Sequence, residues 1–200
     1  MVVGGRQPVP WEKQFNRSAA LQRAERLFWK VGYEKSSMSA LLKAMGIQKG
    51  SFYATFGSKH QLLVEALDGY IEWRFASFQA LRARWPPLDA LRRHLDAVVD
   101  ESTGPDRFMG CFLVNCATEL APGDRIIREI VTKTLRAHAA FYEELLEKAK
   151  ARKELPADYA VHVQATALLG LVMAMRVSAR GGLPAESIRA LRAQADRLVM

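Results

Sequence analysis

The segment over residues 46–59, GIQKGSFYATFGSK, constrains the fold of this chain more than any other. A helical pattern ends at Gly46, and a short segment follows that carries small polar residues and one tyrosine. Ser58 then stands where a residue that caps a further helix is expected. The short segment is too poor in apolar residues to be an ordinary core helix. A helix, a tight turn, a short exposed helix and a new helix in this order predict a helix-turn-helix unit.

The rest of the chain also has the periodicity of helices. From residue 16, apolar side chains follow i, i+4, i+7, i+8 and i+11 spacing until Gly32 ends the pattern, and Ser37 can cap a second helix. A long helix is predicted from Ser58, and further helices are predicted over 88–101, 111–120, 124–153, 156–180 and 184–199. No stretch rich in Val, Ile and Thr alternates as a strand would. We therefore expect an all-α protein of nine or ten helices.

Length and composition limit the class of protein. With 200 residues, half of them hydrophobic and 25% charged, the chain suits one compact domain or two small ones that share a core. No apolar run approaches the roughly 20 residues of a membrane span, and no secretory leader is recognisable. Cys111 and Cys116 lie five positions apart in a helical pattern, a rise of about 7.5 Å that is too long for a disulfide. We expect a reduced, cytoplasmic protein without a membrane partner.

Basic residues are concentrated in the N-terminal part. The net charge is +8, and residues 1–75 hold 11 Lys and Arg against 6 Asp and Glu. This excess suits contact with a polyanion, because neutralising phosphates releases counterions. Charge alone is not specific, since many basic proteins bind no nucleic acid.

Three stretches within residues 16–66 resemble a known family. They read Ala24-x-x-Leu27-Phe28-x-x-x-Gly32-Tyr33, then Ser36-Ser37-Met38-x-x-Leu41, then Gly46-Ile47-x-Lys49-Gly50-Ser51-Phe52-Tyr53-x-x-Phe56-x-Ser58-Lys59-x-x-Leu62. In these residues the chain resembles the tetracycline-repressor (TetR) family of bacterial transcriptional regulators. The remaining two thirds match that family only in helical layout. His60 stands where the family often has an acidic residue, and the small Ala54 leaves the base preference open.

The resemblance implies an all-α fold with an N-terminal three-helix DNA-binding domain, which contains the helix-turn-helix, and a C-terminal helical domain for ligand binding and dimerisation. We accordingly divide the chain into a flexible N-terminal arm over 1–13, a DNA-binding domain over 14–60 and a ligand-binding and dimerisation domain over 61–200. The expected function is a homodimeric repressor that a small-molecule effector releases from a palindromic operator. Half-sites about 34–36 Å apart, or multiples of this, follow from such a dimer.

The recognition helix of a helix-turn-helix enters the major groove with its N-terminal residues leading. Gln48 suits paired hydrogen bonds to adenine, and Lys49 suits guanine O6 and N7 or a phosphate. Gly50 lacks a Cβ atom, so the backbone can approach DNA closely, and Ser51 offers a short hydroxyl. The predicted DNA-binding residues are Ser37, Gln48, Lys49, Gly50, Ser51, Tyr53, Thr55 and Lys59.

Some of these residues also have simpler interpretations. Ser37 can instead cap a helix without touching DNA, and capping is the better interpretation for Ser58. Lys49 can be a solvated surface charge, and Tyr53 can pack its ring while its hydroxyl stays in water. The alternative for the whole chain is an all-α small-molecule-binding protein or enzyme that does not bind DNA.

The C-terminal part contains no pattern typical of catalysis. The sequence has no Gly-rich phosphate loop, no His/Cys cluster with metal-ligand spacing and no nucleophile motif, so we expect neither an enzyme nor a cofactor or metal. The resemblance implies an effector pocket among the helices over 88–180, although aromatic residues at helical spacing are also typical of plain core. Polar residues in apolar helices need partners and can orient a ligand. The candidate effector or sensing residues are Cys111, Phe112, Asn115, Phe141 and Gln164.

The stretch GCFLVN over 110–115 resembles a Gly-Cys-x-x-x-Asn stretch in one subset of the family. Some regulators in the wider family sense electrophiles or oxidants through a cysteine. Reactivity requires a thiolate in a partly exposed, electropositive setting, and Arg107 lies one helical turn before Cys111. An inert, buried cysteine is the alternative.

The last two predicted helices are apolar and have no later element to cover them. This pattern favours a subunit interface, and the resemblance implies the same, a two-fold dimer built on four helices. Burial against the protein's own core is the alternative for part of each helix.

Overall fold

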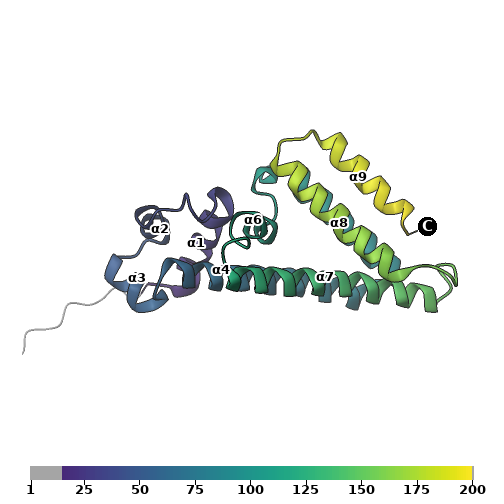
Figure 1. The fold of residues 1–200 in the computed structure, drawn as a ribbon, viewed down its shortest axis with the longest axis horizontal. Helices are drawn as coiled ribbons and strands as arrows, with labels where there is room; N and C mark the ends of the chain where they lie inside the picture. Colours follow the sequence, from purple (N-terminus) through teal and green to yellow (C-terminus); the bar gives the residue numbers. More distant parts are fainter. Residues whose placement is uncertain (1–14, 200) are drawn as a thin grey trace, which may run out of the picture.

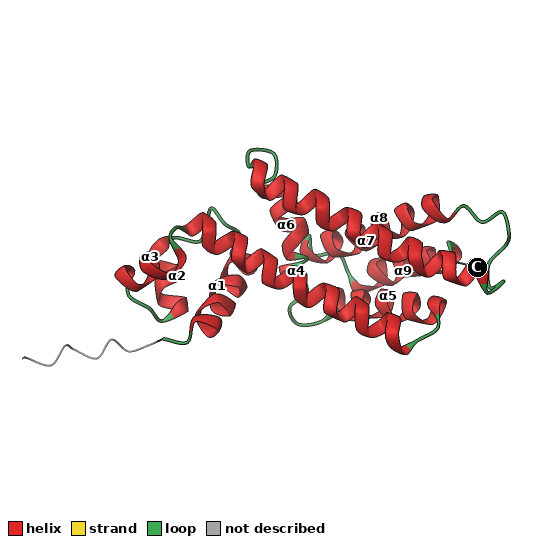
Figure 2. Cartoon of the chain, turned by 90° about the horizontal axis from the view of Figure 1, so that it is seen from below, coloured by secondary structure: helices red, strands yellow, loops and turns green. Residues whose placement is uncertain are grey.

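The computed structural model describes residues 15–199. Every regular element in this range is helical (Figure 2), which confirms the predicted all-α fold. The elements are α1 (Arg17–Val31), α2 (Met38–Met45), α3 (Lys49–Phe56), α4 (Lys59–Arg84), α5 (Pro87–Thr103), the 3-10 turn η1 (Arg107–Met109), α6 (Phe112–Glu119), α7 (Arg125–Ala151), α8 (Val161–Arg180) and α9 (Ala185–Arg197). The predicted arm over 1–13 lies outside the described residues.

Polar side chains and glycines set the ends of the N-terminal helices. The Ser37 hydroxyl accepts a hydrogen bond from the Ala40 amide at 3.1 Å, and the Ser58 hydroxyl accepts one from the Gln61 amide at 3.0 Å. Each serine satisfies an amide that the first turn of its helix leaves unpaired. Gly46 ends α2 in the left-handed conformation, with φ of 71°. Both predicted serine caps are confirmed.

Helices α1, α2 and α3 form a compact head at one end of an elongated molecule (Figure 1). Their core is apolar and includes Phe28, Leu41, Met45 and Phe52, all almost fully buried. The same hydrophobic cluster continues through the start of α4 into α6 and the start of α7. The head therefore shares its core with the neighbouring part of the body.

The body is built on two long helices, α4 and α7, that run along the molecule away from the head (Figure 1). A second hydrophobic cluster joins the far half of α4 to α5, α7, α8 and α9. Because α4 begins in the head and ends in the body, it is a continuous rod between the two cores.

The start of α8 differs from the prediction. The sequence predicts a helix from Pro156, whereas α8 begins at Val161. The connector before it is fixed by tertiary contacts: Leu155 is buried, and the Tyr159 hydroxyl donates a hydrogen bond to the carbonyl oxygen of Leu198. These contacts with distant residues hold the connector outside the helix. They cannot be predicted from the local sequence pattern.

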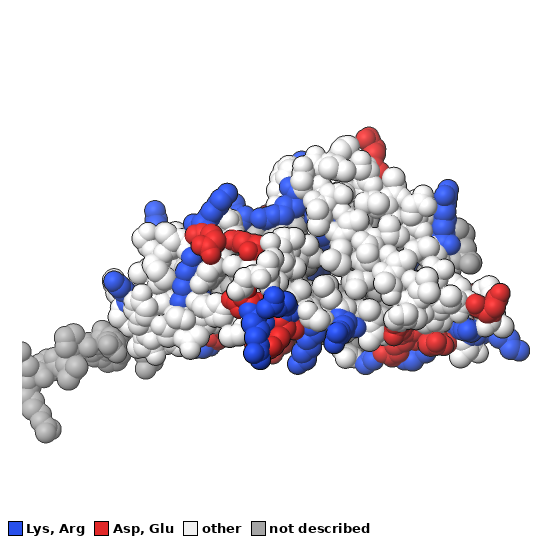
Figure 3. All heavy atoms as spheres, in the orientation of Figure 1, with Lys and Arg blue, Asp and Glu red and all other residues white. Residues whose placement is uncertain are grey.

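Helix α8 is long and apolar enough to cross a membrane by length and composition alone. One side of it is core, because Ala165, Leu168 and Met175 are fully buried. The other side is exposed: Val163 and Val177 have 62% and 54% of their surface accessible. Figure 3 shows a broad face over α8 with few charged side chains. This face is an apolar surface that the single chain leaves uncovered.

Candidate DNA-binding surface and internal cavity

The first turn of α3 projects from the head. Gln48, Lys49 and Gly50 are all exposed, and Gln48 is the N-cap residue of α3 but makes no side-chain capping hydrogen bond. Its amide is therefore free to meet another molecule. The helix is held from beneath by Phe52 and Phe56, which are buried in the head.

Gly50 is not required by the packing of the chain itself. A Cβ atom built on Gly50 meets no other atom within 4 Å. Glycine inside a helix is less stable than alanine by roughly 0.5–1 kcal/mol. Gly50 thus makes α3 less stable than alanine would, and it leaves the backbone of the exposed first turn without a side chain.

The other predicted DNA contacts surround this turn. Ser51 and Thr55 are half-buried on α3, whereas Tyr53 is 47% exposed. The Tyr53 ring packs edge to face against the Phe52 ring, with 5.2 Å between the ring centres. These positions present hydroxyl groups around the exposed end of α3.

Two more predicted contacts come from the adjoining helices. Ser37 is exposed at the start of α2, and its hydroxyl lies 2.9 Å from that of Ser39. The Lys59 ammonium lies 4.1 Å from the centre of the Tyr33 ring, a cation–π contact that restrains it at the start of α4. The structure brings all eight predicted DNA-binding residues to the same end of the molecule.

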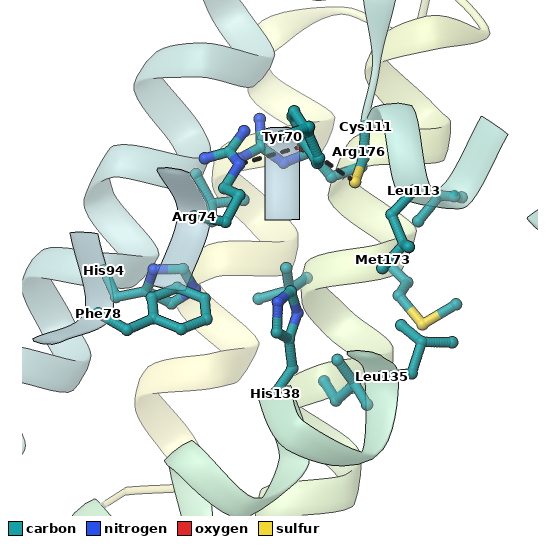
Figure 4. A pocket seen from close by; sticks show the side chains of 14 residues that line it. Tyr70, Arg74, Phe78, His94, Cys111, Leu113, Leu135, His138, Met173 and Arg176 are labelled. Atoms are coloured by element: carbon teal, nitrogen blue, oxygen red, sulfur yellow. Dashed lines mark hydrogen bonds between the residues drawn. The ribbon is translucent and has the colours of Figure 1, made fainter. Parts of the chain in front are cut away.

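The body contains a cavity of about 40 Å³ lined by residues of α4, α5, α6, α7 and α8 (Figure 4). Most of its wall is apolar. The polar and titratable groups that line it are Tyr70, Arg74, His94, Cys111, His138 and Arg176. Such a mixture, apolar walls with a few convergent polar groups, is typical of small-molecule sites.

A network of buried charges forms one end of the cavity. Arg74 binds the Glu101 carboxylate with two hydrogen bonds, one of them 2.8 Å long, and Arg176 Nη2 lies 2.7 Å from the same carboxylate. The Arg74 Nε group also donates to the Tyr70 hydroxyl at 3.0 Å, and that hydroxyl lies 3.3 Å from Cys111 Sγ. The network joins α4, α5 and α8 to the residue that precedes α6.

The ion pairs keep this network charged. Burial opposes ionisation of the Glu101 carboxyl, but the hydrogen bond from Arg74 and the charge of Arg176 hold its pKa below its ordinary value. Burial likewise opposes the charge on Arg74, and the Glu101 carboxylate more than offsets this, so that the pKa of Arg74 is raised. Arg74 therefore carries its charge inside the protein.

Two histidines line the cavity in their neutral form. Burial, with the charges of Arg176 and Arg74 and the neighbouring His138, lowers the pKa of His94 to about 3. Burial and the charge of Arg74 lower the pKa of His138 to about 4. His94 Nε2 lies 2.8 Å from the Tyr142 hydroxyl, whereas His138 Nε2 is buried without a hydrogen-bond partner among the described residues.

The predicted effector residues are not all brought together. Cys111 lines the cavity. It is the N-cap of α6, so it precedes that helix instead of lying within it as the sequence suggested. Phe112 and Asn115 are buried beside the head, Phe141 packs in the core and Gln164 is half-buried on α8. None of these four is part of the cavity wall.

The charged residues of the cavity are not among those predicted from the sequence, although the sequence contains a signal for them. Tyr70, Arg74 and Phe78 are spaced four residues apart, so the arginine lies on the apolar stripe of α4. Arg176 follows Leu168 and Val172 at the same spacing on α8. A charged residue on a buried helical stripe needs a buried partner, and that requirement marks both arginines.

Two family models match the chain over most of its length. The model described as "Bacterial regulatory proteins, tetR family" matches residues 20–66, and "Tetracyclin repressor-like, C-terminal domain" matches residues 87–193. The chain belongs to the TetR family. The resemblance found in the sequence is confirmed, and the TetR-family match extends through the C-terminal half, where only the helical layout had suggested it.

Individual relatives agree with this assignment. The HTH-type transcriptional repressor ComR of Escherichia coli (strain K12) is 34% identical over 185 residues, 88% of this chain and 85% of that protein. The regulator YezE of Bacillus subtilis (strain 168) is 32% identical over 145 residues, 72% of this chain and 74% of that protein. A cysteine mutant of the TetR-family regulator CifR, solved with 26-bp operator DNA, has a TM-score of 0.82 and 29% identity, covering 92% and 97% of the two chains.

The TetR family consists of DNA-binding transcription regulators that act as homodimers and are not enzymes. The chain is thus a DNA-binding regulator, as predicted. The alternative of an all-α enzyme or binding protein without DNA binding is set aside.

Proposed function

We propose that this TetR-family protein is a cytoplasmic repressor that binds a palindromic operator. A small molecule that binds in the cavity releases the protein from the DNA. The exposed first turn of α3, with its bare Gly50 backbone, carries the DNA-binding part of the proposal. The similarity to ComR, a named repressor, supports repression, and the operator complex of CifR supports the target.

In this proposal the DNA-binding unit spans residues 14–60, and residues 61–200 bind the effector and form the dimer. Gln48 and Lys49 contact base edges in the major groove, while Gly50 lets the backbone approach. The hydroxyl groups of Ser37, Ser51, Tyr53 and Thr55, together with the Lys59 ammonium, bind phosphates and fix the register on the duplex.

Release follows from the continuity of α4. This helix starts with Lys59 in the head and carries Tyr70 and Arg74 in the cavity wall. A ligand that binds better when α4 is displaced favours dimers whose two heads are wrongly spaced for the operator. The shift in population is limited by the difference between the ligand's affinities for the two states.

We also propose Cys111 as a sensing residue of the same cavity. Cys111 is partly accessible and lies against the Tyr70 hydroxyl, three hydrogen bonds of the network away from Glu101. Cys116 is unsuited to this role, because burial and the charges of Glu119 and Cys111 raise its pKa to about 12. A maleimide tests the difference: the Cys111 sulfur forms a bond to one alkene carbon and a proton adds to the other. Sensing is supported if maleimide treatment lowers the operator affinity of the wild type but not that of Cys111→Ser. Equal operator affinity of treated and untreated wild type contradicts it.

A gel-shift titration with DNA from upstream of the protein's own gene tests the regulator function. We expect specific binding whose affinity falls with salt. Replacing Lys49 and Tyr53 together by alanine should weaken specific binding, because one base contact and one phosphate contact are lost. Lys133→Ala, an exposed lysine on α7, is the matched control. Equal affinity of the double variant and the wild type contradicts the proposal.

A further inference from the structure

We propose that the cavity takes a small apolar acid, whose anionic group replaces the Glu101 carboxylate between Arg74 and Arg176. The inference rests on the effector role proposed for the cavity and adds the chemical class of the ligand. It places an aromatic or aliphatic body in the apolar part of the cavity and a single negative charge at the arginine end.

The first observation is an imbalance of charge. Arg74 and Arg176 are both buried, with 9% and 6% of their surface exposed, and among the described residues both pair with the same carboxylate, that of Glu101. Two guanidinium groups share one carboxylate, so the position between them is held by two positive charges. A buried charge is stable only when it is paired, so an anion that takes the place of the Glu101 carboxylate is stabilised by both arginines.

The two cavity histidines do not alter this balance. His94 and His138 are neutral at neutral pH, because burial and the nearby arginines lower the pKa of each. They can exchange hydrogen bonds with a ligand without adding charge. The buried Nε2 atom of His138, which lacks a partner, is available to a polar substituent on the ligand body.

The second observation is that Glu101 can leave. Its side chain is 37% exposed, whereas those of its two arginine partners are only 10% and 7% exposed. Glu101 and Arg176 also line a surface groove together with Trp29 and Trp73, and Arg176 lines the cavity as well. The ion pair is therefore the partition between groove and cavity. The carboxylate can turn into the groove while both guanidinium groups stay in place.

The third observation concerns the body of the ligand. Phe78, Leu113, Leu135 and Met173 surround the part of the cavity away from the arginines (Figure 4). The present volume of about 40 Å³ is well below the roughly 300 Å³ of a typical small-molecule site. An apolar body must therefore push side chains aside, and the flexible Met173 is best able to move. Occupation of the site is in this way tied to displacement of the surrounding helices.

The first experiment compares acids with their uncharged counterparts on the purified full-length protein. Butyrate, hexanoate, benzoate and phenylacetate are each titrated by calorimetry against the matching amide. We expect at least one carboxylate to bind tenfold or more tightly than its amide. If no carboxylate binds more tightly than its amide, the proposal is overturned.

The second experiment uses variants of the ion pairs with the best carboxylate. Glu101→Gln removes the competing charge and should tighten carboxylate binding at least tenfold while leaving amide binding within twofold. Arg176→Met should weaken carboxylate binding at least tenfold. The matched control is Asp100→Asn, the adjacent acid, which borders the groove without pairing to either arginine and should change affinity less than twofold.

The displacement of Glu101 can still be tested if the first variant does not fold. If Glu101→Gln is unfolded, Glu101→Asp shortens the carboxylate arm and should tighten binding of the acid in the same direction. Unchanged carboxylate affinity in the folded variant overturns the displacement of Glu101.

Gel shifts on the same samples separate this inference from the proposed function. Specific operator binding without any preference for carboxylates overturns the ligand class and leaves the regulator intact. A carboxylate that binds through Arg176 but does not release the operator overturns the effector role and supports the site. Release of the operator by that carboxylate, lost in Arg176→Met, supports both.

Discussion

The indole nitrogen of Trp29 donates a hydrogen bond to the carbonyl oxygen of Gly110 at 3.2 Å. Trp29 belongs to α1 of the head, and Gly110 immediately precedes Cys111 in the cavity wall. Gly110 has φ of 65°, and a Cβ atom there would lie 3.2 Å from the Arg180 side chain. The backbone beside the cavity is thus fixed by a direct bond to the DNA-binding head, independently of α4.

Trp29→Phe tests the strength of this bond. The ring can still stack on Phe112, but the donor is lost and the Gly110 carbonyl oxygen loses its partner. We expect the free energy of unfolding to fall by about 1 kcal/mol, measured by urea titration. Trp73→Phe is the control, because Trp73 is 52% exposed and its indole makes no hydrogen bond among the described residues. Equal losses in the two variants would show that the Trp29 bond contributes nothing specific.

Gly50→Ala should separate stability from DNA binding. The added methyl group meets open space in the free protein, so helix α3 should gain roughly 0.5–1 kcal/mol. The same methyl group would stand between the helix and DNA, and we expect operator affinity to fall tenfold or more in gel shifts. Gly123→Ala, also in open space but in the turn before α7, should leave affinity unchanged. Full affinity in Gly50→Ala would place DNA elsewhere on the head.

Stability should fall with pH below neutrality because of the buried histidines. The pKa values of His94 and His138, about 3 and about 4, lie below the value of about 6.5 expected in the unfolded chain. Between pH 6.5 and about 4 the unfolded chain therefore binds protons that the folded protein does not. Each histidine then lowers the free energy of unfolding by up to about 1.4 kcal/mol per pH unit, with no effect above pH 7.

Urea titrations between pH 7.5 and 5.0 measure this dependence. His94→Gln and His138→Gln should each flatten the fall in stability, and the double variant should flatten it most. The same slope in the wild type and the double variant would assign the dependence to other groups.

The uncovered face of α8 should form the dimer. Val163 and Val177 are four helical turns apart on that helix and both are exposed. We expect Val177→Glu to produce monomers in light scattering and to weaken operator binding at least tenfold, because two linked heads bind DNA together. Ile126→Glu, a similarly exposed apolar residue on α7, is the control and should remain dimeric. A dimeric Val177→Glu protein would move the interface away from this face.

The sequence predicted those parts of the protein whose causes are local. Ser37 and Ser58 cap helices through amides three residues away, and Gly46 ends α2 through its own backbone, so each is readable from its neighbours. The cavity cannot be predicted from neighbouring residues in the sequence. Arg74, His138 and Arg176 come from three helices that meet only in the folded chain. The late start of α8 has the same explanation, since it depends on a bond from Tyr159 to the far end of α9.

Glu101 has a consequence for the range of concentrations to which the protein responds. A carboxylate that belongs to the chain is always present at the two arginines, and no dilution removes it. An external acid must compete with this internal carboxylate for the site. Its apparent affinity is therefore its intrinsic affinity multiplied by the fraction of molecules in which Glu101 has left. Abundant small anions without an apolar body gain nothing from the exchange. The ion pair therefore prevents the ordinary small anions of the cell from occupying the site and releasing the operator.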